Sequence, residues 1–181
     1  MGIFRRTHGE PLAVTMAAVK LGDRFLSVGV RDPELIAVLA AKAGLTGTAC
    51  AVDPDEPSVK SAAAAIEAAG ALAEVTRAPW GVWPYNGGSF DVALIRDLLP
   101  ALTPDNRASA VSEVLRVLRP GGRVLVIDGR ERKPFAWVAG GSRTAATGKA
   151  AAEALTTAGF AAVRILAEQD GVSYVEGIKK A

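Results

Sequence analysis

The chain has 181 residues, of which half are hydrophobic and 22% are charged, and its formal net charge is +2. This balance indicates one globular domain with a substantial core and excludes a disordered chain. The small net charge does not favour nucleic acid or an anionic membrane as a partner, and no run of 18 apolar residues predicts a membrane span. Because Cys50 is the only cysteine, no internal disulfide can form, and we expect a buried, inert thiol in a cytoplasmic protein.

Helix and strand signals alternate along most of the chain. We expect residues 1–9 to form a mobile tail and residues 10–181 to form a single domain, which begins with a short helix over 10–20. Predicted strands cover residues 24–30, 48–53, 71–76, 90–96 and 123–128, and predicted helices cover 33–42, 56–69 and 104–118. Strands that alternate with helices in this way predict an α/β fold, with a doubly wound, mostly parallel sheet and right-handed crossovers.

After residue 128 the alternation changes. Residues 147–158 have the pattern of a helix that stops at Gly159, and apolar strands over 160–168 and 172–179 follow. Only Gln169, Asp170 and Gly171 separate these two strands, and Asp-Gly between apolar runs predicts a hairpin. The chain should therefore end in an antiparallel pair added to the parallel sheet.

Two short motifs mark the centre of the chain. Residues 118–122 read Leu-Arg-Pro-Gly-Gly, which predicts a tight turn from a helix into a strand buried on both faces. Residues 88–92 read Gly-Ser-Phe-Asp-Val and lead into the strand before it. With the terminal hairpin, these motifs make residues 20–180 resemble the class I S-adenosylmethionine-dependent methyltransferases, in particular the small-molecule type 11 domains. The resemblance implies a Rossmann-like methyltransferase fold of seven strands in the order 3-2-1-4-5-7-6, with the last strand antiparallel.

Ligands of such sheets bind beyond the carboxyl ends of the strands, where the strand order reverses. The resemblance implies an acidic residue and a Gly-x-Gly-x-Gly loop after the first strand. This chain offers Gly29, Val30 and Arg31 as cofactor-binding candidates, but Ser27 replaces the acid, and Arg31 and Pro33 replace the later glycines. Two interpretations stay open: a cofactor loop narrowed by Arg31, and a well-capped turn that binds no ligand.

Candidates for the ribose and the adenine of the cofactor follow the second and third strands. By the resemblance, Asp53 accepts hydrogen bonds from the ribose hydroxyls beside Pro54, although Asp53 could instead cap the next helix. Ala78 fits the small residue expected near the adenine, whereas Arg77 does not supply the acid expected there. Three aromatic residues either cover this pocket or pack their loop onto the sheet: Trp80, Trp83 and Tyr85.

The end of the fourth strand carries the two weak candidates for a catalytic role. Arg96 could bind a carboxylate of the cofactor or the substrate, and Asp97 could act as a base or orient Arg96. The alternative is an Arg–Asp surface pair. Asp91, at the other end of this strand, is expected to be structural.

The remaining polar candidates are weaker. Arg130, Arg132, Lys133 and Arg143 either form a solvated basic loop or meet an acidic substrate. His8 lies in the expected tail and is not predicted to act as a base. No cluster of cysteine and histidine has the spacing of metal ligands, so no metal is predicted.

Two functions stay open. The first is transfer of a methyl group from S-adenosylmethionine to an unidentified acceptor, either a small molecule or a macromolecule. The second is a non-catalytic, methyltransferase-like module, which has lost cofactor binding through Arg31 and Pro33 and serves as a partner or scaffold. A nicotinamide-dependent reductase is disfavoured by the missing glycine fingerprint. The short connection after the fifth strand leaves little lid, which a second copy in a homodimer could supply.

Overall fold

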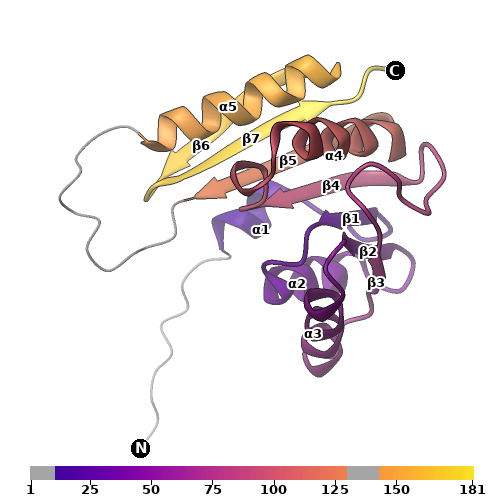
Figure 1. Cartoon of the computed structure of the whole chain (residues 1–181). Coiled ribbons are helices and arrows are strands. Elements are labelled where there is room, and N and C mark those ends of the chain that lie inside the picture. The colour runs from indigo at the N-terminus through magenta and orange to yellow at the C-terminus, as the bar shows by residue number, and fades with distance from the viewer. Residues whose placement is uncertain (1–10, 130–142) are drawn as a thin grey trace, which may run out of the picture.

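A computed structural model of the chain describes residues 11–129 and 143–181 (Figure 1). The helices are α1 (Leu12–Ala17), α2 (Pro33–Ala43), α3 (Glu56–Ala68), the 3-10 helix η1 (Leu99–Ala101), α4 (Pro104–Val117) and α5 (Arg143–Ala158). The strands are β1 (Arg24–Val28), β2 (Thr48–Asp53), β3 (Glu74–Arg77), β4 (Phe90–Arg96), β5 (Leu118–Gly129), β6 (Ala161–Gln169) and β7 (Val172–Ile178). The expected mobile tail and the candidates His8, Arg130, Arg132 and Lys133 lie outside the described residues.

The strands form one sheet of seven in the order β3-β2-β1-β4-β5-β7-β6. The pairs from β3 to β5 are parallel, and β7 is antiparallel to both β5 and β6. This order confirms the predicted fold class. It also places the strand-order reversal between β1 and β4, so the carboxyl ends of these two strands define the expected site.

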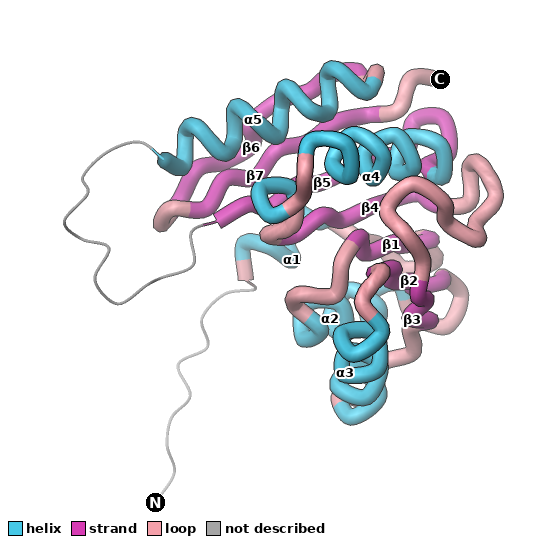
Figure 2. The backbone as a smooth tube through the Cα atoms, in the orientation of Figure 1, coloured by secondary structure: helices cyan, strands magenta, loops and turns pink. Residues whose placement is uncertain are grey.

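Helices cover both faces of the sheet (Figure 2), and the two cores follow the alternation of side chains along the strands. On one face, Val28, Ile95 and Val126 pack with buried residues of α4 and α5. On the other face, Phe25 and Ile127 pack with buried residues of α1, α2 and α3. Strands buried on both faces have apolar side chains throughout, as the sequence of the central strands indicates.

Some boundaries differ from the predicted ones for local reasons. β1 ends at Val28 rather than residue 30 because Gly29 takes a positive φ of 83°, which turns the chain out of the strand. β3 begins at Glu74 rather than residue 71 because the Ala71 N–H bonds the Ile66 carbonyl and completes the end of α3. α1 is shorter than predicted because Ala18 adopts a left-handed conformation.

Further comparisons with the predicted elements concern the start of β5, the terminal hairpin and the start of α5. β5 begins at Leu118, which pairs with Phe90 before a bulge, so the Pro-Gly-Gly segment is an irregular start of the strand and not a separate turn. The predicted hairpin is confirmed, since Asp170 and Gly171 have φ of 53° and 83°, as a type I′ turn requires. α5 begins at Arg143, earlier than the predicted residue 147.

Membrane-spanning helices and metal-ligand clusters are both absent from the described residues. Within residues 11–129 and 143–181, no helix is both long and apolar enough to cross a membrane. The same part of the chain contains no group of three or more His, Cys, Asp or Glu side chains arranged to hold a metal ion.

Candidate cofactor-binding site

The glycine turn after β1 and the acid that ends β2 lie side by side at the carboxyl edge of the sheet. The Gly29 N–H donates to the Val52 carbonyl at 2.7 Å, which joins the turn to the last residues of β2. Ser27 is buried, and its hydroxyl donates to the Gly29 carbonyl at 2.9 Å. Ser27, at the position where the resemblance implies an acid, therefore holds the turn in shape. Gly29 is required there by its positive φ and by its neighbour, because a Cβ at this position would lie 3.3 Å from Cδ2 of Leu98.

Asp53 presents a buried carboxylate beside this turn. Its Oδ1 accepts the Asp55 N–H at 2.9 Å, and its carboxylate also interacts with the backbone N–H of Val30. Burial raises the pKa of Asp53, while these two N–H groups and the positive charge of Arg31 act in the opposite direction. The N-cap of α3 is Asp55, whose side chain accepts the Ser58 N–H at 3.0 Å. Asp53 is therefore not the residue that caps α3, and the Asp53 carboxylate lies at the carboxyl edge of the sheet.

The segment after β3 adds one small residue and one long one. Ala78 is buried, and its N–H donates to the Asp53 carbonyl at 3.2 Å, so it lies next to the acid. Arg77 turns its guanidinium toward α3, where it contacts the Pro54 carbonyl at 3.2 Å and a carboxylate oxygen of Glu56 at 3.4 Å. The structure thus brings Gly29, Val30, Asp53 and Ala78 together, and it gives Arg77 a role in joining β3 to α3.

Arg96 and Asp97 are both held by partners of their own. Arg96 pairs with Asp32 at 3.0 Å and more loosely with Asp97 at 3.5 Å. Asp97 has a positive φ of 49°, and its Oδ1 accepts the Gly129 N–H at 2.8 Å, which ties the end of β4 to the end of β5. These contacts make Asp97 a bridge between strands. Its partner Asp32 is the N-cap residue of α2, so Arg96 is joined to the segment that follows the glycine turn.

The aromatic loop packs onto the sheet. Trp83 is buried in the core beneath α4, and Trp80 and Tyr85 pack against the same core. Tyr85 also meets Phe90 edge to face, with 5.1 Å between the ring centroids. This arrangement supports the packing role for these aromatic residues over a cover for the pocket.

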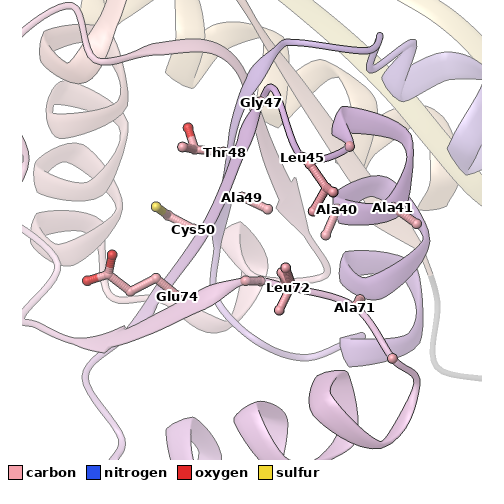
Figure 3. Close-up of a pocket in the computed structure, with 13 residues that line it drawn as sticks. Ala40, Ala41, Leu45, Gly47, Thr48, Ala49, Cys50, Ala71, Leu72 and Glu74 are labelled. Carbon is pink, nitrogen blue, oxygen red and sulfur yellow. The ribbon is translucent and has the colours of Figure 1, made fainter.

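A hollow of about 590 Å³ lies at the amino half of β2 and does not belong to this site (Figure 3). Figure 3 shows it between Ala40 and Leu45, from α2 and the turn after it, and Leu72, ahead of β3. Cys50 is among its lining residues, and burial raises the pKa of the Cys50 thiol to about 11, so the thiol stays neutral at pH 7. In parallel sheets ligands bind at the opposite edge, where Asp53 lies.

Two residues at the carboxyl edge were not identified as site candidates from the sequence. Leu98, two residues after the end of β4, is buried and rests against Gly29. Asp128, near the end of β5, is 2% exposed, although it carries a carboxylate. The signal that could have found Asp128 is the one that found Asp53: an acid that closes an apolar strand of a parallel sheet.

A sheet of this order, with a glycine turn and a strand-terminal acid at its carboxyl edge, defines a Rossmann-like domain. Residues 25–122 match the methyltransferase domain family. This match covers more than half of the chain, which therefore belongs to that family.

Similar proteins agree with this assignment. The curated ubiquinone/menaquinone biosynthesis C-methyltransferase UbiE of Ralstonia pickettii (strain 12J) is 29% identical over 115 residues, which cover 64% of this chain and 46% of the relative. The chain thus spans about half the length of the curated relatives that it matches.

Solved structures share the fold. A SAM-dependent methyltransferase from Aquifex aeolicus has a TM-score of 0.74 at 20% identity, with 92% of this chain and 87% of that chain covered. The [4+2]-cyclase SpnF has a TM-score of 0.70 at 19% identity, with 94% of this chain and 79% of that chain covered. The fold therefore occurs in proteins with different activities, and the chemistry has to be argued from the site.

Proposed function

We propose that this domain binds S-adenosylmethionine at the carboxyl edge of β1, β2 and β4 and transfers its methyl group to an acceptor. The observation that carries the proposal is the junction of the Gly29–Val30 turn with the buried carboxylate of Asp53. A carboxylate at the end of β2 is placed to accept hydrogen bonds from a ribose, and a glycine turn lets a ligand approach the backbone closely. Family membership and the curated methyltransferase relatives support the same activity.

The residues at this edge fit such a cofactor in three respects. Asp53 would bind the ribose hydroxyls, since hydrogen bonds within the protein occupy only part of its acceptor capacity. Ala78 has only a methyl side chain, which suits a flat base beside it, and Gly29 has no side chain to project into the site. When bound, the cofactor supplies an electrophilic methyl group on a sulfonium, so the protein needs mainly to orient the acceptor and to take up a proton where the acceptor has one.

A non-catalytic scaffold is the second candidate, and one observation favours it. Arg31 stands where the resemblance implies a glycine, and its positive charge acts on Asp53 across the turn. Arg96, which could bind a carboxylate of the cofactor, is already paired with Asp32. If these guanidinium groups fill the proposed cofactor crevice, then the Asp53 carboxylate interacts with Arg31 and not with a ribose.

Calorimetric titration with S-adenosylhomocysteine distinguishes the two candidates. We expect micromolar binding by the unmodified chain and a loss of at least 100-fold in Asp53→Ala. Asp105→Ala is the matched control, because Asp105 is an exposed acid in the first turn of α4 and should leave the affinity unchanged. Absence of binding at millimolar ligand contradicts the proposal and supports the scaffold. A gain of affinity in Arg31→Gly would show that the Arg31 side chain narrows the site.

A further inference from the structure

A second hollow at the carboxyl edge lies on the opposite face of the sheet from α2 and α3. It has a volume of about 360 Å³ and is bounded by η1, α4, α5 and the end of β5. Most of its lining is small or apolar, and its polar side chains are a carboxylate, a guanidinium and a hydroxyl: Leu99, Pro100, Arg107, Asp128, Thr147, Ala150 and Ala151. The volume suits a molecule of one or two rings.

Asp128 is the unusual member of this lining. The residue is 2% exposed, and its Oδ1 has no hydrogen-bond partner within the part of the chain that the structure describes. Buried polar atoms nearly always have a partner, because an unsatisfied one loses its hydration without compensation. A buried acceptor that lines a hollow is therefore suited to a hydrogen-bond donor brought by a ligand.

The charges around Asp128 set its protonation near neutrality. Its pKa is raised to about 7, chiefly by burial and also by the negative charge of Asp97 at the end of β4. Arg107 on α4 and the backbone N–H of Leu98 act in the opposite direction. The carboxyl group can thus accept a hydrogen bond as an anion at pH 8 and is largely neutral at pH 5.5.

Arg107 uses two of its five guanidinium N–H donors to hold the backbone beside the hollow. Its Nε donates to the Leu99 carbonyl at 2.9 Å, and its Nη2 donates to the Leu102 carbonyl at 3.2 Å. These bonds fix η1 as a wall of the hollow. A ligand of this site should be neutral, because Asp128 repels an anion and Arg107 repels a cation, and it should have an apolar body against Leu99 and Ala151 and one hydroxyl or N–H for Asp128.

We propose that this hollow is a binding site for a neutral, largely apolar small molecule that donates one hydrogen bond to Oδ1 of Asp128. The assignment of this molecule as the methyl acceptor rests on the proposed function, whereas the binding itself does not. Leu98 connects the two sites, since its side chain rests against Gly29 and its N–H acts on Asp128. The hollow and the glycine turn are therefore linked in space through a single residue, Leu98.

The test uses two probes that differ by one hydrogen-bond donor. The full ¹⁵N-labelled chain is titrated at pH 8 with p-cresol and with 4-methylanisole, in which a methyl group replaces the phenolic hydrogen. We expect p-cresol to shift the amide signals of Leu98, Gly129 and Ala151 and to bind at least tenfold more tightly than 4-methylanisole. Lowering the pH from 8 to 5.5 should weaken p-cresol several-fold, since a neutral carboxyl group is a weaker acceptor.

Three variants assign the effect to the site. Asp128→Asn should reduce the preference for p-cresol several-fold, since an amide oxygen is a weaker acceptor than a carboxylate, and should remove its dependence on pH. Circular dichroism checks that the variant is folded. Ala150→Phe, a change at an exposed position of the lining, should block both probes without altering the core. Asp105→Asn removes an exposed acid from α4 outside this lining and should bind p-cresol like the unmodified chain.

The outcomes separate this proposal from the proposed function. Equal binding of the two probes, unchanged binding by Asp128→Asn, or amide shifts centred on Leu45 and Leu72 would overturn the site. Failure to bind p-cresol at 50-fold excess over the protein at millimolar concentration would overturn it as well. If p-cresol binds as expected and S-adenosylhomocysteine does not, the site stands and its role as an acceptor site is rejected.

Discussion

Asp91 and Asp128 show how differently the two edges of the sheet treat a carboxylate. Asp91 begins the β4 region at the amino edge, where it accepts the Arg24 backbone N–H at 2.8 Å and the Arg24 Nε at 3.0 Å and also pairs with Arg119. These hydrogen bonds, chiefly those from Arg24, hold the pKa of Asp91 well below its usual range. Asp128, at the carboxyl edge, is more deeply buried and has the opposite shift, to about 7.

This difference distinguishes a carboxylate that stabilises the fold from one that is suited to binding a ligand. Asp91 has partners for both carboxylate oxygens and joins β1, β4 and β5, as expected of a residue that stabilises the fold. Asp128 costs folding free energy when it ionises, because desolvation dominates and its Oδ1 lacks a partner within the described residues. Groups that destabilise a fold in this way are concentrated at ligand sites. The carboxyl edge is therefore where we expect activity to be lost by mutation and the amino edge where we expect stability to be lost.

Asp128→Asn gives the largest expected change in stability, and the change is a gain. The pKa of Asp128 is raised in the folded state, so the folded chain binds more protons than the unfolded one between about pH 4 and 7. Its stability therefore falls as the pH rises through this window. We expect Asp128→Asn to stabilise the chain by about 2 kcal/mol at pH 8 and by much less at pH 4.5, the burial of the amide offsetting part of the effect.

Urea unfolding at both pH values measures this difference. Asp105→Asn, an exposed change, should leave the stability equal to that of the unmodified chain at each of the two pH values. A loss of stability in Asp128→Asn at pH 8 would contradict the comparison, since it would make Asp128 a structural residue like Asp91.

Asp91→Asn is expected to destabilise the chain by about 1 kcal/mol at pH 7, a value kept low because the Arg24 and Arg119 side chains are 41% and 49% exposed. A depressed pKa gives stability that is complete above the unfolded value and disappears as the pH falls below it. The cost of Asp91→Asn should therefore shrink from pH 7 toward pH 2.5, the reverse of the trend for Asp128→Asn. Thermal unfolding of both chains across this pH range measures the stability cost. A cost that does not change with pH would show that the ion pairs are not its cause.

Asp97→Asn gives the smallest expected effect on stability, within about 0.5 kcal/mol. Asn tolerates the positive φ of this position and keeps an oxygen for the Gly129 N–H. The change removes a negative charge beside Asp128, so the pKa of Asp128 should fall. Carboxyl ¹³C chemical shifts of Asp128 followed against pH measure this fall directly. No change in that titration would mean that Asp97 does not contribute to the raised pKa of Asp128.

The fold could be predicted from sequence because it depends on patterns along single segments. The Pro-Gly-Gly segment, the Asp-Gly hairpin and the buried strands each fix a local conformation, and together they admit few topologies. Asp53 could be placed beside Gly29 for the same reason, since strands β1 and β2 are neighbours and both end at the same edge.

The state of each site side chain could not be predicted, because it depends on contacts between distant segments. Arg96 is paired with Asp32, which is 64 residues earlier in the chain, and Arg77 is drawn to α3. Leu98, which follows β4, contacts Gly29, which follows β1, at the point where the strand order reverses. The unsatisfied oxygen of Asp128 is a property of everything packed around it, and no local pattern in the sequence reports it.

The contact between Leu98 and Gly29 gives the two sites a means of cooperativity. A ligand that shifts the backbone of Leu98 would change both its packing against the turn and the N–H that acts on Asp128. Linkage then requires that each ligand change the affinity of the other by the same factor. A thermodynamic cycle with S-adenosylhomocysteine and p-cresol, repeated in Leu98→Ala, would measure that coupling and show how much of it passes through one leucine.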